Sequence, residues 1–191
     1  MTTNSFGCNA TLWSAQSTRS GLNEIKWLES IGLDLYLVNS NGHGILHKSA
    51  QRGKMDVCRW IIEACQSRWR ECNGESTSST SKTRHLEDES SFEVLNQIGP
   101  DTEGHCPSDL AGMEGFDLLA NWLVVEERRI GMEACIVHPA SSLPSWLRDG
   151  IQNSKHNINT FGLDSVFEKG AGVKKICAYI SQTGHKRCRN E

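Results

Sequence analysis

Residues 39–62 decide the fold: Asn39-Ser-Asn-Gly42-His-Gly-Ile-Leu-His47-Lys-Ser-Ala50-Gln-Arg-Gly53-Lys-Met-Asp-Val57-Cys-Arg-Trp60-Ile-Ile. A second copy of this pattern occupies residues 101–123: Asp101-Thr-Glu-Gly104-His-Cys-Pro107-Ser-Asp-Leu-Ala111-Gly-Met-Glu-Gly115-Phe-Asp-Leu-Leu119-Ala-Asn-Trp122-Leu. The copies align without a gap, because Gly42 and Gly104, Gly53 and Gly115, and Trp60 and Trp122 are each 62 positions apart. Self-similarity of this kind indicates an array built from one repeated supersecondary unit.

An earlier copy opens the chain. Asn4-Ser-Phe-Gly7 aligns with the turn at Gly42, and Ala15 aligns with Ala50. After two extra residues the copy resumes, so that Trp27 precedes Trp60 by 33 positions. Near the other end, residues 159–183 have two readings, a degraded fourth copy or an irregular tail with one amphipathic helix.

The spacing and the motif resemble the ankyrin repeat, whose period is 33 residues. That family places a turn glycine before Thr-Pro-Leu-His-x-Ala-Ala, then a glycine between two antiparallel helices, then an aliphatic second helix. Gly42, Leu46, His47, Ala50 and Gly53 fit this pattern. Gly44 and Cys106 stand where the family has threonine, and in the later copy Ser108-Asp109 replace Leu-His, which weakens the helix caps of single units.

The resemblance implies an all-α solenoid of stacked helix-turn-helix units, with three clear repeats, a degenerate fourth under one reading, and two inserted loops. It implies that His47 joins one unit to the next through backbone hydrogen bonds, and we expect the three aligned tryptophans to fill the gaps between units. The positions expected to maintain the repeat are Gly7, Ala15, Trp27, Gly42, His47, Ala50, Gly53, Trp60, Gly104, Pro107, Ala111, Gly115 and Trp122.

Two intervals exceed one repeat and predict insertions. Residues 66–98 are rich in serine, threonine and charge, a composition typical of disorder. The expected organisation is 4–65 for the first two repeats, 66–98 for a largely disordered insertion, 99–127 for the third repeat, 128–158 for a loop with a short helix near Pro144, 159–183 for the degenerate fourth repeat and 184–191 for a basic tail.

The function expected from the resemblance is non-catalytic binding of a partner protein by a scaffold or adaptor. In such arrays the turn tips and the exposed sides of the first helices form a concave surface. The residues expected there are Trp13, Gln16, Asn41, His43, Lys48, Gln51, Arg52, Glu103, His105, Met113 and Glu114. Because the array starts so near Met1, we also expect either a longer parent chain or contact of Leu12 and Trp13 with a partner or a second copy.

Composition excludes several other classes. The net charge of −3 gives no basic footprint for nucleic acid, and we expect neither a membrane span nor a signal peptide, hence an intracellular protein, cytoplasmic or nuclear. The eight cysteines contain no Cys-x-x-Cys pair, so no metal is expected, and no cofactor or catalytic motif is found.

Two alternatives to the scaffold stay open. One is an accessory protein that binds RNA or a membrane surface through Arg128-Arg129, Lys174-Lys175 and the basic tail. The other is an enzyme whose catalytic segment lies within residues 126–191. Neither has a recognisable motif behind it.

Overall fold

The computed structural model describes residues 3–73, 95–138 and 140–156, and in those residues every regular element is helical. The prediction of an all-α fold is therefore confirmed for the described chain. The helices are α1 (Ala10–Gln16), α2 (Leu22–Ser30), α3 (Ile45–Ala50), α4 (Met55–Asn73), α6 (Pro107–Met113), α7 (Asp117–Val137) and α8 (Ser145–His156), with a 3₁₀ turn at Ala140–Ser142. The expected fourth repeat, 159–183, and the basic tail lie outside the described residues.

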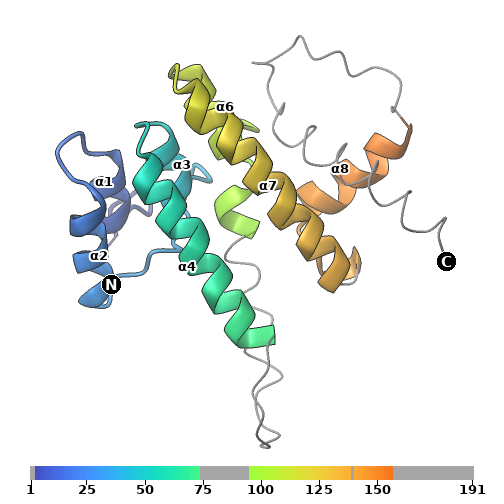
Figure 1. Ribbon diagram of the computed structural model, residues 1–191, viewed down its shortest axis with the longest axis horizontal. Coiled ribbons are helices and arrows are strands. Elements are labelled where there is room, and N and C mark those ends of the chain that lie inside the picture. The colour runs from blue at the N-terminus through green and yellow to red at the C-terminus, as the bar shows by residue number, and fades with distance from the viewer. Residues whose placement is uncertain (1–2, 74–94, 139, 157–191) are drawn as a thin grey trace, which may run out of the picture.

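Three helical hairpins lie side by side in chain order. Each consists of a short first helix and a second helix that is longer: α1 and α2, α3 and α4, α6 and α7. The short helix α3 packs against α1 on one side and α6 on the other. Figure 1 shows the result, a row of hairpins with α1 and α2 at one end and the long helices α4 and α7 running beside each other.

The core is continuous along this row. Ala15 and Ala50 occupy equivalent positions in the first helices, while Ala111 aligns with Ser49, one position earlier; all three alanines are completely buried. A methyl group is small enough to let neighbouring helices approach closely, so these alanines set the spacing between hairpins. The larger side chains of the core that are almost fully enclosed are Leu12, Ile25, Ile45, Leu46, Ile61, Leu95, Ile98, Leu123 and Leu147.

The three aligned tryptophans do not share one environment. Trp60 and Trp122 are partly buried against the core, and each ring lies under a cation from the preceding hairpin. Lys26 Nζ is 5.6 Å from the Trp60 ring centroid, and Arg59 Cζ is 5.7 Å from that of Trp122. Trp27 is 60% exposed, so the expectation that it fills a gap between units is wrong. The reason is positional, because no described hairpin precedes it.

Two expected insertions contain more helix than their sequences suggested. Helix α4 continues to Asn73, and residues 95–98 are helical, so part of the segment 66–98 is ordered. Residues 74–94 lie outside the described part of the chain. The span 128–158 was expected to be a loop with a short helix near Pro144; α8 begins one residue after Pro144, in agreement, but α7 also continues to Val137 where a loop was expected.

The length of α7 has a physical cause in its charged residues. Arg129 forms ion pairs with Glu126, three residues before it, and with Glu133, four residues after it, at 2.6 and 2.9 Å. Pairs at these spacings lie on one side of a helix and stabilise it. Ile130 and Ala134 are buried on another side, so packing and ion pairing both favour continuation of the helix beyond residue 127.

The turn before each first helix requires glycine. Gly7, Gly42 and Gly104 have backbone φ angles of 75°, 76° and 87°, in the left-handed region that side chains with a Cβ disfavour. At Gly42 there is also no space, because a Cβ atom would lie 2.8 Å from the Cα of Asp101 in the next turn. Gly115 has a similar φ of 80°, but a Cβ atom there would meet nothing within 4 Å.

Replacement of Gly42 and Gly115 by alanine should distinguish backbone strain from a steric clash with the neighbouring turn. We expect Gly115→Ala to lower the free energy of unfolding by about 1–2 kcal/mol, the usual cost of a left-handed φ. Gly42→Ala should cost more, because the second and third turns must also move apart. Urea denaturation of both variants measures the difference, and equal losses would show that the turns are not held at the observed distance.

Candidate functional site

The three turns, residues 4–8, 39–43 and 101–105, have the same internal hydrogen bonds and are called here the turn stack. Each turn begins with a residue whose side-chain oxygen accepts hydrogen bonds from the backbone N–H groups two and four positions later, at 2.8–3.0 Å. These first residues are Asn4, Asn39 and Asp101. Short polar side chains of this kind form such turns readily, which explains why Asn or Asp stands at the start of every copy.

Backbone hydrogen bonds join one turn to the next. The N–H of Ser40 donates to the carbonyl of Phe6, and the N–H of Thr102 donates to the carbonyl of Asn41, each at 3.0 Å. Phe6 and Asn41 stand at the same place in their turns, directly before the glycine. The identical bond formed twice fixes the spacing of the tips and the direction in which their side chains project.

Side chains make a second set of bonds between turns. The Asn39 amide donates to Cys8 Sγ at 3.2 Å, and in the next pair His43 Nε2 is 2.9 Å from Asp101 Oδ2. Cys8 and His43 are equivalent residues, each following a turn glycine. His43 was expected on an exposed binding surface, but its imidazole is instead mostly engaged in holding the second turn to the third.

The protonation of this pair follows from its surroundings. Burial lowers the pKa of His43, although its hydrogen bond with Asp101 acts in the opposite direction. Burial tends to raise the pKa of Asp101, but hydrogen bonds from the backbone of His105, the side chain of His43 and the backbone of Glu103 outweigh it and lower that pKa. A carboxylate can only accept, so the neutral imidazole carries its proton on Nε2 and donates it to Asp101.

His47 is completely buried in α3 and contacts only backbone on its two nitrogens. Its Nε2 lies 2.9 Å from the carbonyl of Gly99, and its Nδ1 accepts from the N–H of Gly44 at 3.3 Å. These bonds link the start of α3 to the segment before the third turn, which is the kind of contact that the resemblance implies. Burial lowers the pKa of His47 to about 3, so the ring is neutral.

Gln97 has a comparable role that the repeat pattern did not reveal. Its amide is 1% exposed, donates to the carbonyl of Tyr36 at 3.0 Å and accepts from the N–H of Leu46 at 3.3 Å. It thereby satisfies a free N–H group in the first turn of α3. Gln97 lies in the segment expected to be an insertion, where no motif marks it.

Most of the expected binding residues are accessible. Trp13, Asn41, Arg52, Glu103, Met113 and Glu114 are exposed, whereas Gln16, His43, Gln51 and His105 are half-buried. Lys48 departs from the expectation, since its side chain is 9% exposed. It lies on α3, every residue of which is buried, and burial lowers its pKa.

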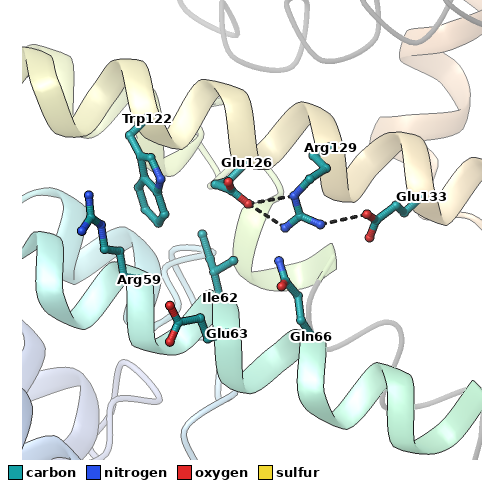
Figure 2. Close-up of a pocket in the computed structure, with 8 residues that line it drawn as sticks. All are labelled: Arg59, Ile62, Glu63, Gln66, Trp122, Glu126, Arg129 and Glu133. Atoms are coloured by element: carbon teal, nitrogen blue, oxygen red, sulfur yellow. Dashed lines mark hydrogen bonds and ion pairs between the residues drawn. The ribbon is translucent and has the colours of Figure 1, made fainter. Parts of the chain in front are cut away.

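A groove of about 520 Å³ lies between α4 and α7, and Figure 2 shows the side chains that line it. Its eight lining residues are Arg59, Ile62, Glu63 and Gln66 from α4 and Trp122, Glu126, Arg129 and Glu133 from α7. Of these, only Trp122 was predicted from the sequence as a repeat position, although the Glu126–Arg129–Glu133 spacing was a readable signal of a charged helix face.

On the α7 side of the groove, Arg129 is held in place by Glu126 and Glu133 of the same helix. Burial alone would lower the pKa of the Arg129 guanidinium. Its hydrogen bonds to Glu126 and Glu133 outweigh this effect, so the pKa lies above its ordinary value. The Gln66 amide of α4 lies against the same guanidinium, where only its oxygen can accept the protons. The lining residues bring carboxylates, guanidinium groups and an indole ring, so the groove is suited to ion pairing and ring contacts.

Only some of the residues expected to bind RNA or a membrane surface lie in the described part of the chain. Arg129, expected under the nucleic-acid or membrane reading, is engaged by its two glutamates, while residues 174–175 and the tail lie outside the described chain. None of the described helices combines the length and apolar character that a membrane crossing needs. Within the same residues no group of three histidine, cysteine or acidic side chains is placed to hold a metal ion.

Comparison of the chain with protein-family models, with curated protein sequences and with solved structures finds no match. What the described residues define is an all-α protein whose three consecutive hairpins share one turn geometry.

The neutral state of His47 predicts an acid-sensitive fold. Its pKa is about 3 when folded and 6.5 in its unperturbed state, so its contribution is complete above pH 6.5 and is lost as the pH falls toward 3. In that window the wild type should lose up to about 1 kcal/mol of unfolding free energy per pH unit because of His47. We expect His47→Gln, which retains a donor and an acceptor, to lack this part of the pH dependence. Urea denaturation at pH 7, 6, 5 and 4 measures this slope.

The matched control is His105→Gln, a half-buried histidine in the third turn. We expect this variant to keep the acid sensitivity of the wild type. If His47→Gln and the wild type lose stability in parallel below pH 6.5, then His47 is not the group that titrates.

Proposed function

We propose that the three hairpins are ankyrin-type repeats and that their turn tips and first helices bind a partner protein without catalysis. Four features support this assignment: the 33-residue spacing, the left-handed turn glycines, the hydrogen bonds between successive turns, and the packing of α3 between α1 and α6. Stacked units of this kind present extended surfaces whose individual side chains do not support the fold.

The observation that carries the proposal is a division of roles at the turn tips. Residues at the start of each turn, together with His43, are engaged in holding the turns together. Asn41 and Glu103 immediately precede the turn glycines, and their side chains are exposed. Asn41 accepts the bond from the third turn through its backbone carbonyl, and the Glu103 carboxylate lies 3.8 Å from His105 Nδ1 within its own turn. Exposed polar side chains on a rigid backbone are well suited to selective recognition.

The neighbouring exposed residues define the chemistry of the surface. Arg52 lies at the end of the second hairpin's first helix, and its Nε donates to the carbonyl of Gln16 at 2.9 Å. Met113 and Glu114 occupy the corresponding region of the third hairpin and are exposed. The surface therefore changes from cationic on the second hairpin to acidic on the third, and we expect a partner with charges of the opposite order.

A triple variant tests the surface. Asn41→Ala, Glu103→Ala and Glu114→Ala together remove exposed side chains without touching a bond between turns. We expect the melting temperature to stay within about 2 °C of the wild type, because surface substitutions rarely cost more than about 0.5 kcal/mol. Affinity purification with quantitative mass spectrometry should show at least about a tenfold loss of the specifically captured partner, as loss of central contacts does.

The control variant carries Asp56→Ala and Glu63→Ala, two exposed acids on α4. This variant should capture the same partner as the wild type. Equal capture by all three proteins would rule out the turn tips as the binding surface, and loss in the control alone would move the site to the groove between α4 and α7.

A further inference from the structure

The outer face of the first hairpin is hollowed and largely apolar. A depression of about 370 Å³ lies between α1 and α2, and its principal lining residues are Ala10, Trp13, Ser20, Glu24, Trp27 and Leu28. Trp13 and Trp27 are 56% and 60% exposed. Two indoles exposed to this degree in one depression form an unusual surface, because isolated apolar residues rather than clusters are normal on a protein exterior.

The equivalent positions in the other hairpins are covered by the hairpin that comes before. Lys48 and Leu110 stand where Trp13 stands, and their side chains are 9% and 6% exposed. In the second helices, Ile61 and Leu123 stand where Leu28 stands, and both are completely buried. The first hairpin therefore exposes the face that the second and third hairpins use for docking.

The aligned tryptophans also show that the first hairpin lacks a contact that the other two hairpins have. Trp60 and Trp122 each lie under a cation, Lys26 or Arg59, supplied by the preceding hairpin. Trp27 has the same place in its own hairpin, yet its ring lies open. The face thus has both the apolar surface and the aromatic ring of an internal interface, and it needs an occupant that contributes a cation.

Among the residues that the structure describes, the third hairpin does not carry a cation at the matching position. The residue equivalent to Lys26 and Arg59 in the third hairpin is Asn121. A second copy docked head to tail would therefore leave Trp27 without its usual partner. The first hairpin itself carries the missing charge, because exposed Arg19 directly precedes Ser20, which lines the depression, and Glu24 lies within it.

We propose that two copies of this chain associate through these faces about a twofold axis, with Trp13 and Trp27 of each copy covered by the other. Such a contact is self-complementary, because Arg19 of one copy can pair with Glu24 of the other twice over. Twofold dimers are the commonest form of protein self-association, and they close without leading to open polymers. This proposal rests on the alignment of the three hairpins with one another. It does not depend on whether the turn tips bind a partner protein.

Sedimentation velocity of the full chain over a range of concentrations tests the association. We expect a monomer–dimer equilibrium with no larger species. The double variant Trp13→Ser and Trp27→Ser should raise the dissociation constant by about tenfold or more, as loss of central aromatic contacts usually does. Circular dichroism verifies that this variant folds. The control is Leu118→Ser, which removes an 84% exposed apolar side chain from α7 and should leave the dissociation constant unchanged.

A charge exchange tests the geometry without removing the indoles. Arg19→Glu and Glu24→Arg, each alone, should weaken self-association, whereas a mixture of the two variants should form a heterodimer in which both charge pairs are restored. Glu24 also accepts from the N–H of Gly21 at 2.7 Å, so thermal melting of Glu24→Arg accompanies the measurement.

Three results would overturn the proposal. They are a wild type that stays monomeric up to about millimolar concentration, a series of species that grows beyond the dimer as head-to-tail docking would give, and an equal loss of association in Leu118→Ser. A failure of partner capture at the turn tips would leave this result unaffected, so the two proposals fail separately.

Discussion

The burial of α3 is the constraint on which the rest of the structure depends. This helix has six residues, Ile45 to Ala50, and all of them are buried. A helix so short has no stability of its own in water, since forming the first turn costs more entropy than its few hydrogen bonds return. It exists because α1 and α6 enclose it and because side-chain hydrogen bonds satisfy backbone N–H groups at its start. His47 of α3 and Gln97 make these bonds, and each also connects α3 to a different part of the backbone.

This constraint explains which features could be predicted from the sequence. The turn glycines could, because a left-handed φ and a contact at 2.8 Å leave no other residue available at Gly42. The exposure of Trp27 could not, because repeat alignment compares residue types but does not say how far each side chain is covered. Gln97 was also beyond reach, since a buried amide in a polar segment has no local signature. The burial of Lys48 was missed for a related reason, as the family pattern leaves that position variable.

The second helices differ at the positions that face outward. In α4 the outward positions carry Asp56 and Glu63, while the equivalent residues of α7 are Leu118 and Val125, both exposed. Helices α4 and α7 are joined by apolar packing, to which Ile62 and Trp122 contribute, and also by the contacts of Arg59 with Trp122 and of Gln66 with Arg129. An ion pair exposed at the surface contributes little, but the partly buried guanidinium of Arg129 has several acceptors at once.

The end face of the first hairpin follows from the same distinction between covered and uncovered positions. Glu24 stands where Val57 and Leu119 are buried, so this face cannot pack as a plain apolar interface. A carboxylate removed from water without a partner is costly, and the cost falls when a cation accompanies it. A second hairpin that brings Arg19 beside Glu24 meets that requirement and covers the indoles at the same time. Because the charge pair must be desolvated together with the rings, the association is reversible and sensitive to salt, in contrast to the permanent packing of α3 between its neighbours.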